Sequence, residues 1–402
     1  MHAAPRPTVS HPGRLAVDVE YVTGLLLELL AVPSPAGYTD EVVHLAGREL
    51  TRLGIPFELT RRGAIRADLG GRVTTPDRAI VAHLDTIGAM VTALKPNGRL
   101  GIAPIGTWSS RFAAGARVKI LSDLGSRTGT ILPLKASGHA FDDEVDTQPT
   151  DWDHVEIRVD EVAQHDQDLR NLGLRVGDYV AIEPAPHVTP SGFINARHLD
   201  DKAGVAVLLG AAKAVLESGR QLPVDCHLIF TISEEVGSGS SHTLQRDVAE
   251  MVTIDSAPQA PGQAAIEFGV TVGMMDSSGP FDYHLTHKLI RLCERHGIPF
   301  QRDVFRHYRS DSASAVDAGN DLRTALVCFG VDASHGWERT HTHAMQSLAE
   351  LLSLYMLSEP TFQRDADELT SLDGFSRMPT DPGAPTHPED AALPTDSTAA
   401  PG

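Results

Sequence analysis

The chain alternates between two patterns of apolar residues. Apolar side chains recur at helical spacing over residues 15–30 and again from Val42 to Leu53, which predicts two amphipathic helices. Short continuous apolar runs, such as Ala79–Ala82 and Cys226–Phe230, instead predict buried strands. This alternation favours an α/β fold in which helices cover both faces of a mixed sheet.

A middle segment departs from this pattern. Between residues 90 and 187 helical spacing is scarce, and β-rich runs lie between glycines and prolines: Arg117–Leu121, Thr128–Leu132, Val155–Val159 and Tyr179–Ile182. We therefore expect a small all-β, barrel-like domain over 90–187. It would be inserted into a larger α/β/α domain made of residues 15–89 and 188–360.

The later elements follow the same alternation. The patterns predict a strand pair over Phe57–Leu69, helices over 203–216, 281–296 and 344–357, strands over 226–232, 251–254, 265–274, 300–305 and 324–329, and a helix soon after Gly239. Both ends of the chain, 1–14 and the acidic, Pro-rich segment 378–402, have few large apolar residues, and we expect them to be disordered.

Charge and cysteine usage narrow the classes of function. The sequence has 34 Lys and Arg against 53 Asp and Glu, a formal net charge of −19, which argues against nucleic acid or an anionic membrane as a partner. The cysteines Cys226, Cys293 and Cys328 stand singly, so neither a disulfide framework nor a structural zinc site is expected. Neither a signal peptide nor a membrane span is recognisable, and we expect a cytoplasmic protein.

Two adjacent carboxylates, Glu234 and Glu235, follow the apolar run Cys226–Phe230 and precede a glycine turn. In an open α/β sheet, ligands bind beyond the carboxyl ends of the strands. Two neighbouring carboxylates in a dry cleft need a nearby cation or a shared proton, so this position favours a metal. The alternative is a solvated pair of loop residues.

Further metal-binding residue types follow other predicted strand ends or turns: His83 with Asp85, Asp200 with Asp201, Asp255, and His341. Taken singly, each of these residues also has an ordinary structural explanation that involves no metal. Asp200 and Asp201, for example, could cap the next helix. Imidazole and carboxylate ligands together suit zinc, cobalt or manganese, and carboxylates can bridge two ions. The recurrence at successive strand ends favours a two-metal centre, with ions roughly 3.5–4 Å apart.

These segments resemble the five metal-site motifs of the co-catalytic di-metal aminopeptidases of the glutamyl or tetrahedral type. The matching segments are His83–Asp85, Leu199–Gly204, Ser233–Gly237, Thr253–Asp255 and the segment around His341. The 90–187 insert, especially Gly173–Asp178, is similar to the small β domain of that family. The resemblance covers about residues 20–357 and leaves out both tails.

The resemblance implies a role for each matching residue. Five would be metal ligands: His83 and Asp255 on one ion, Glu235 and His341 on the other, and Asp200 bridging both. Asp85 would orient His83, and Glu234 would be the general base. Because successive strand side chains point to opposite faces, these roles require a turn at Glu234 and Glu235. Asp311, in a Ser-Asp-Ser segment, resembles a family motif on the substrate side.

The last motif departs from the commoner form, in which Ser follows the ligand histidine and a Glu comes a turn later. Thr342 follows His341 here, and His343 is a rival ligand, with His335 a more distant one. We prefer His341 because His343 falls where the last helix should begin.

The activity implied is that of a metal-dependent exopeptidase that removes N-terminal residues from short peptides, with two divalent ions, zinc first and cobalt or manganese as alternatives. The family's β domain implies a homo-oligomer, a dimer or a dodecamer. The Trp337–His341 segment resembles a bacterial subgroup associated with the osmoprotectant N-acetylglutaminylglutamine amide, which implies a short modified peptide as substrate. The alternatives are a deacylase or amidohydrolase acting on an N-acylated dipeptide or similar amide, and a non-catalytic assembly or binding protein, which would not need Glu234.

Overall fold

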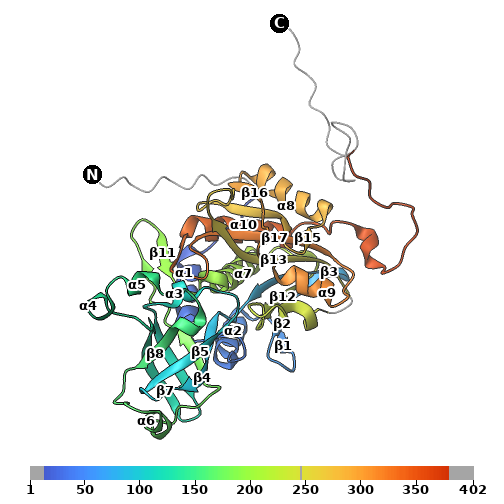
Figure 1. Cartoon of the computed structure of the whole chain (residues 1–402). Helices are drawn as coiled ribbons and strands as arrows, with labels where there is room; N and C mark the ends of the chain where they lie inside the picture. The colour runs from blue at the N-terminus through green and yellow to red at the C-terminus, as the bar shows by residue number, and fades with distance from the viewer. Residues whose placement is uncertain (1–12, 245–246, 380–402) are drawn as a thin grey trace.

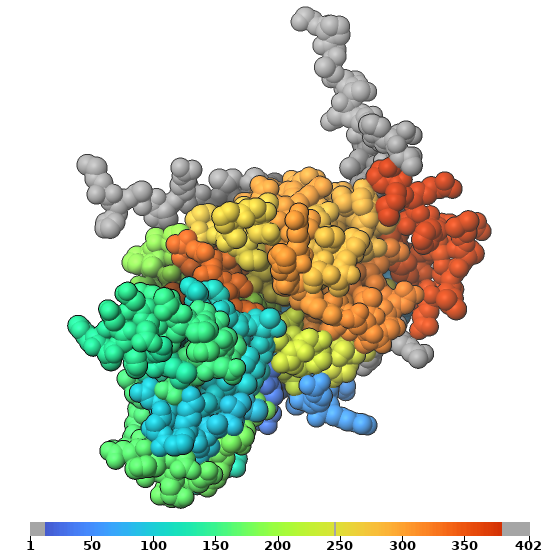
Figure 2. Space-filling model, in the orientation of Figure 1, coloured from blue at the N-terminus to red at the C-terminus, as the bar shows by residue number. Residues whose placement is uncertain are grey.

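The computed structural model describes residues 13–244 and 247–379, so 1–12 and 380–402 of the two tails predicted to be disordered lie outside it. The described chain forms a body of helices around one large sheet, and a smaller barrel that projects from it (Figures 1 and 2). Within this described part, no helix is both long and apolar enough to cross a membrane.

Twelve strands of the described chain form one mixed sheet, in the order β1-β2-β12-β3-β13-β17-β18-β11-β10, with β14 beside β17 and β15 and β16 beside β14. Their bounds are β1 Phe57–Leu59, β2 Ile65–Leu69, β3 Gly71–His83, β10 His187–Val188, β11 Phe193–Ala196, β12 Leu222–Thr231, β13 Val248–Gln259, β14 Val270–Asp276, β15 Gly279–Pro280, β16 Phe300–Val304, β17 Arg323–Asp332 and β18 Glu338–His341.

The centre of the sheet is parallel. Strands β12, β3, β13 and β17 run in one direction, with Thr231 of β12 opposite His83 of β3. The carboxyl ends of these four strands therefore meet at one edge of the sheet, where residues following different strands can lie close together.

The longer helices of the described chain surround the sheet: α1 Val19–Ala31, α2 Asp40–Leu53, α7 Leu199–Ser218, α8 Tyr283–His296, α9 Asp311–Asp317 and α10 Thr342–Met356. Alternate residues of β3 face opposite layers. Ile80 and Ala82 lie in the core shared with α1, α7 and α10, whereas Ala79 and Val81 pack on the α9 side with Ala315. The continuous apolar run is thus buried on both faces, as predicted for a central strand.

The insert is a closed barrel with the strand order β4-β5-β8-β7-β6-β9. Its strands are β4 Gly88–Leu94, β5 Arg99–Ile105, β6 Arg117–Ser122, β7 Gly125–Pro133, β8 Val155–Val159 and β9 Tyr179–Ile182, and its short helices are α3 Ser110–Ala113, α4 Gly138–Phe141, α5 Glu144–Thr147 and α6 Asp166–Asn171. Val118, Ile157 and Val180 belong to a core of its own. These features confirm the predicted fold class, while the predicted domain limits at 15–89, 90–187 and 188–360 stay a prediction.

Two local predictions differ from the structure. The helix expected soon after Gly239 is only a single 3-10 turn, Gly239–His242, and α9 was not predicted. Both segments consist mainly of small or polar residues without helical spacing of large apolar ones. Tertiary hydrogen bonds between the two segments, described below, hold them instead.

Candidate metal centre

The residues of the site come from the carboxyl edge of the parallel strands. His83 is the last residue of β3, Asp255 lies in the second half of β13, and Glu234 and Glu235 follow β12. They meet Asp200 from the start of α7, whose first residues depart from helical geometry at Asp200 and Asp201.

Asp200 stands between two histidines. Its Oδ1 lies 3.2 Å from Nε2 of His83, and its Oδ2 lies 3.5 Å from Nε2 of His335. The same nitrogen of His335 is 3.4 Å from Oε2 of Glu235. One carboxylate thus offers an oxygen to each of two groups of potential ligands.

Asp255 completes the first of these groups. His83, Asp200 and Asp255 are all buried, and each offers a ligand atom within 4.8 Å of the other two. Ser256 Oγ also donates to Oδ2 of Asp200 at 3.0 Å, which fixes the orientation of that carboxylate. Nitrogen and oxygen ligands at this spacing suit a divalent transition metal such as zinc.

A turn after β12 gives the two adjacent glutamates separate positions, as their predicted roles require. The N–H of Gly237 donates to the carbonyl of Glu234 at 2.6 Å, and Asp85 accepts the N–H groups of Glu234 and Glu235 at 3.1 and 3.2 Å. Glu235 then faces His335, while Oε2 of Glu234 lies 3.8 Å from Nε2 of His83. Asp85 therefore organises the turn, and it is the backbone carbonyl of Asp85 that accepts from Nδ1 of His83, at 2.9 Å.

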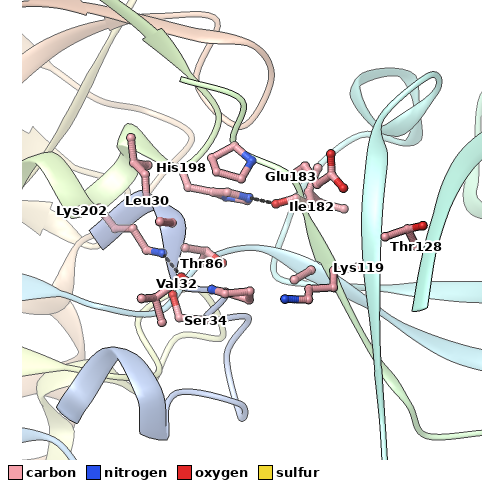
Figure 3. A pocket seen from close by; sticks show the side chains of 14 residues that line it. Leu30, Val32, Ser34, Thr86, Lys119, Thr128, Ile182, Glu183, His198 and Lys202 are labelled. Carbon is pink, nitrogen blue, oxygen red and sulfur yellow. Dashed lines mark hydrogen bonds between the residues drawn. The ribbon is translucent and has the colours of Figure 1, made fainter. Parts of the chain in front are cut away.

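Two side chains near Asp200, those of Lys202 and His198, hydrogen-bond the start of α7 to neighbouring elements (Figure 3). The Lys202 ammonium donates to the carbonyls of Leu29 and Val32, at the end of α1, at 2.9 and 2.6 Å. His198 Nε2 donates to the carbonyl of Ile182, in the barrel, at 3.0 Å. The residues on either side of Asp200 are thus anchored to α1 and to β9, around a cavity of about 330 Å³.

Negative charge dominates the cluster. Burial raises the pKa of Glu235 to about 7, and burial followed by repulsion from Asp200 raises the pKa of Asp255 well above its usual value. Burial also opposes ionisation of Asp200, but His335 and His83 outweigh it and lower the pKa of that carboxyl. Carboxylates that are this costly to ionise together are what one or two bound cations would stabilise, so the donor set fits a metal centre.

The cluster opens into a cavity of about 680 Å³, large enough for a small molecule. Its walls include Asp200, Glu234, Glu235, Asp255 and His335. The potential ligands and the candidate base are therefore accessible from one space.

The structure does not bring His341 to this site, so the prediction of His341 as the fifth ligand is corrected. Its Nε2 hydrogen-bonds to the carbonyl of Ser191 at 2.8 Å, its Nδ1 accepts the N–H of His343 at 3.0 Å, and its ring packs between Phe193 and Phe268. Both ring nitrogens already have partners there, and His341 caps α10. The rival His343 packs beside it and is likewise outside the cavity wall.

His335 takes the place expected of His341, although it was the most distant of the three candidate histidines. It follows β17, the fourth parallel strand, and Glu338 comes three residues later. Glu338 accepts the N–H of His335 at 2.8 Å and that of Asp200 at 3.2 Å. The histidine followed by a glutamate a turn later was the signal in the sequence that could have identified this residue.

Asp311 lies beside the site but not on the wall of the cavity. Its Oδ2 accepts from Thr231 Oγ1 at 2.6 Å, and its Oδ1 accepts from the N–H of Ser240 at 2.7 Å. The carboxylate thus joins the end of β12 to the 3-10 turn at Gly239–His242. This position does not support the predicted contact between Asp311 and substrate.

A second cluster of potential ligands, Asp77, His227 and Asp247, lies near the middle of β3, away from His83 at the end of that strand. A guanidinium already occupies it: Arg66 Nη2 lies 2.9 Å from Nε2 of His227 and 3.7 Å from Oδ2 of Asp247. His227 also contacts Asp77, at 3.1 Å. We interpret this cluster as a structural ion-pair network.

Comparison with known proteins agrees with this arrangement. The sequence profile of the M42 glutamyl aminopeptidase family matches residues 63–351. YhfE of Bacillus subtilis (strain 168), described as a putative aminopeptidase, is 36% identical over 335 residues, which cover 83% of this chain and 96% of that protein.

Solved structures share the fold. An aminopeptidase from the archaeon Desulfurococcus kamchatkensis superposes with a TM-score of 0.78 at 20% identity, covering 88% of this chain and 99% of that one. The TET1 peptidase of Pyrococcus horikoshii, described as assembling into a tetrahedron or a large octahedral shell, has a TM-score of 0.74 at 21% identity, covering 84% and 100% of the two chains. At this identity the likeness establishes the fold.

Proposed function

This chain belongs to the M42 glutamyl aminopeptidase family, and from that premise we propose that it removes N-terminal residues from short peptides with two divalent metal ions held around Asp200. The family makes the chain a hydrolase of peptide bonds. The observation that carries the two-metal proposal is the position of Asp200, whose two oxygens face His83 and His335 separately.

The ligands divide into two sets. We assign His83 and Asp255 to one ion, Glu235 and His335 to the other, and Asp200 to both. The buried first set and the contacts of His335 with Asp200 and Glu235 support this division. Zinc suits the mixture of nitrogen and oxygen ligands best, and cobalt or manganese would also suit it.

Two bound ions would supply a nucleophilic water at neutral pH and polarise the scissile carbonyl. Glu234 lines the same cavity, and its backbone is held by Asp85, so its carboxylate can accept the proton of the attacking water and pass it to the leaving amine. Nδ1 of His83 donates to the Asp85 carbonyl, which leaves Nε2 to act as the ligand atom.

The substitution Glu234→Gln tests this role. It keeps the shape of the side chain and removes its ability to take a proton, so kcat should fall by about a hundredfold to ten-thousandfold. Metal content should stay at the wild-type value, since Glu234 is not assigned as a ligand. Cleavage of aminoacyl anilides and the metal content of the same samples would be measured together.

Glu217→Gln, at an exposed position near the end of α7, is the matched control and should behave as wild type. Near-normal turnover of Glu234→Gln would contradict the assignment of the general base. Cleavage of N-acetyl dipeptides with no cleavage of free aminoacyl anilides would instead favour a deacylase or amidohydrolase.

We also propose that the chain works as a homo-oligomer, supported by two structures of similar fold, one described as a dodecamer and the other as a tetrahedral or octahedral shell. In the insert, Leu124, Val162 and Val176 are more than half exposed and would be available to a contact with another copy of the chain. Light scattering that gave the mass of a single chain at micromolar concentration would contradict this proposal. A cytoplasmic location stays a prediction.

A further inference from the structure

A second, larger cavity adjoins the metal centre. It has a volume of about 810 Å³ and is bounded by residues 258–263 and 302–308. It shares Pro258, His307 and Tyr308 with the cavity of the metal centre, so the two spaces meet along these three residues. The Tyr308 hydroxyl donates to the carbonyl of Ser256 at 3.2 Å, and Ser256 follows the candidate ligand Asp255.

Arginine side chains concentrate around this junction. Arg302 and Arg306 line the second cavity, and Arg309 lines the first. Arg309 is paired with Asp317. Arg302 and Arg306 are exposed, and neither forms a salt bridge with another residue that the structure describes. Their guanidinium groups are therefore available to a ligand.

The acidic residue on the same wall, Asp303, forms no salt bridge with these arginines in the part of the chain that the structure describes. Oδ2 of Asp303 accepts the N–H groups of Ala264 and Ala265 at 2.8 and 3.0 Å, and its Oδ1 accepts the N–H of Val304 at 2.8 Å. These hydrogen bonds hold the loop after β13, residues 260–265, part of which also lines the cavity. Asp303 thus shapes the cavity, and two arginines against this one carboxylate leave the wall with a net positive charge.

This positive charge contrasts with the rest of the molecule. The chain has a formal net charge of −19, so an anion approaching the protein meets net repulsion at long range. Guanidinium groups bind carboxylates with two parallel hydrogen bonds, a geometry that gives both affinity and orientation. The second cavity is therefore suited to an anionic group with planar geometry.

We propose that the second cavity binds a carboxylate of the peptide substrate, through Arg306 and Arg302, while the scissile bond lies at the metal centre. This inference rests on the proposed aminopeptidase function. The carboxylate is either the C-terminus of a short peptide or an acidic side chain after the first residue. An extended peptide advances about 3.3–3.6 Å per residue, so the distance between the cavities sets which residue supplies the carboxylate.

Three peptides distinguish these sources: tri-alanine with a free C-terminus, its C-terminal amide, and an amidated peptide with Glu in the third position. For the wild type, we expect kcat/KM for at least one of the two anionic peptides to exceed that for the neutral amide by about tenfold to a hundredfold, mainly through KM. An advantage of the free acid alone identifies the C-terminus, an advantage of the Glu peptide alone identifies the acidic side chain, and an advantage of both identifies a site open to either carboxylate.

The ratio of kcat/KM for the preferred anionic peptide to kcat/KM for the neutral amide measures the contribution of the carboxylate. The variants Arg306→Gln and Arg302→Gln, singly and together, should lower this ratio toward one. The ratio compares two substrates on the same sample, so it does not depend on the fraction of folded protein. Arg220→Gln is the matched control: this exposed arginine lies just past α7, about 30 Å along that helix from Asp200, and it should leave the ratio unchanged.

Equal kcat/KM for all three peptides in the wild type would overturn the inference, as would a preference that persists in the double variant. A preference for the neutral amide would overturn it in favour of an amidated substrate. In each of these results the metal centre still cleaves peptides, so the proposed function survives. No cleavage of any of the three would overturn the proposed function, and the carboxylate site with it.

Discussion

At the scale of single residues, Glu338 holds the two halves of the centre together without being assigned to either ion. The residue is 1% exposed, and its two carboxylate oxygens accept the backbone N–H groups of His335 and Asp200. Each hydrogen bond fixes the backbone of a proposed ligand, and such supporting contacts set how well the ligands are placed for a metal.

Glu338→Gln should therefore lower both the metal affinity of the centre and the stability of the protein, although every proposed ligand residue is retained. Glutamine retains one acceptor oxygen and turns a donor toward the second N–H, which should cost about 1–3 kcal/mol of unfolding free energy. Metal affinity should fall about tenfold to a hundredfold. Urea unfolding of chelated protein and metal titration would measure the two effects, with the exposed Glu58→Gln as the control. Unchanged metal affinity would contradict this supporting role.

Most of the residues that gather here could be identified from the sequence, because each follows an apolar run that could only be a central strand. His83, Glu234, Glu235 and Asp255 lie close to the ends of β3, β12 and β13. The prediction failed at the last histidine because strand direction is not evident from a local pattern. β18 is antiparallel to β17, so it begins near the site at Glu338 and carries His341 roughly 10 Å away.

At the scale of elements, the position of the end of β12 depends on close packing between the 3-10 turn Gly239–His242 and α9. Neither segment has the apolar spacing of a helix in its own sequence. A Cβ built on Gly239 would lie 1.7 Å from Oδ1 of Asp311, so the 3-10 turn can approach α9 only with glycine there. Asp311 in turn accepts from Thr231, the last residue of β12. This packing fixes the strand that leads into Glu234 and Glu235.

Gly239→Ala should accordingly destabilise the protein by about 1–3 kcal/mol through overpacking and lower activity by displacing the glutamate turn. Gly24→Ala is the control, and we expect it to have the opposite effect. Gly24 lies exposed inside α1, and a Cβ added there would meet no atom within 4 Å. Alanine should therefore stabilise the protein by roughly 0.5–1 kcal/mol. Denaturant unfolding would measure both. Equal effects of the two substitutions would show that the contact between Gly239 and Asp311 is unimportant.

Elements with strong apolar patterns were predictable, and those held by polar contacts were not. The central strands and the larger helices were expected close to where they lie, since burial on one or both faces leaves a clear pattern. α9 and the turn at Gly239–His242 depend on Asp311, Ser240 and Ser314, whose hydrogen bonds join residues more than 70 positions apart. No local pattern contains that information.

At the scale of the whole molecule, the barrel contributes to the centre as well as projecting from it. Nδ1 of His335 donates to the carbonyl of Thr107, and Arg197 donates to that of Phe112, at 2.9 Å in both cases. A backbone carbonyl of the insert therefore orients His335, a proposed metal ligand. The insert was predictable from its β-rich runs, but this contact between the two parts was not.

The central claim is that His335, rather than His341, completes a two-metal centre bridged by Asp200. The most direct test is the number of zinc ions per chain in the wild type, His335→Ala and His341→Ala after reloading and dialysis, measured by elemental mass spectrometry. We predict two ions in the wild type and in His341→Ala, and about one in His335→Ala. Two ions retained by His335→Ala, with one lost from His341→Ala, would contradict the account.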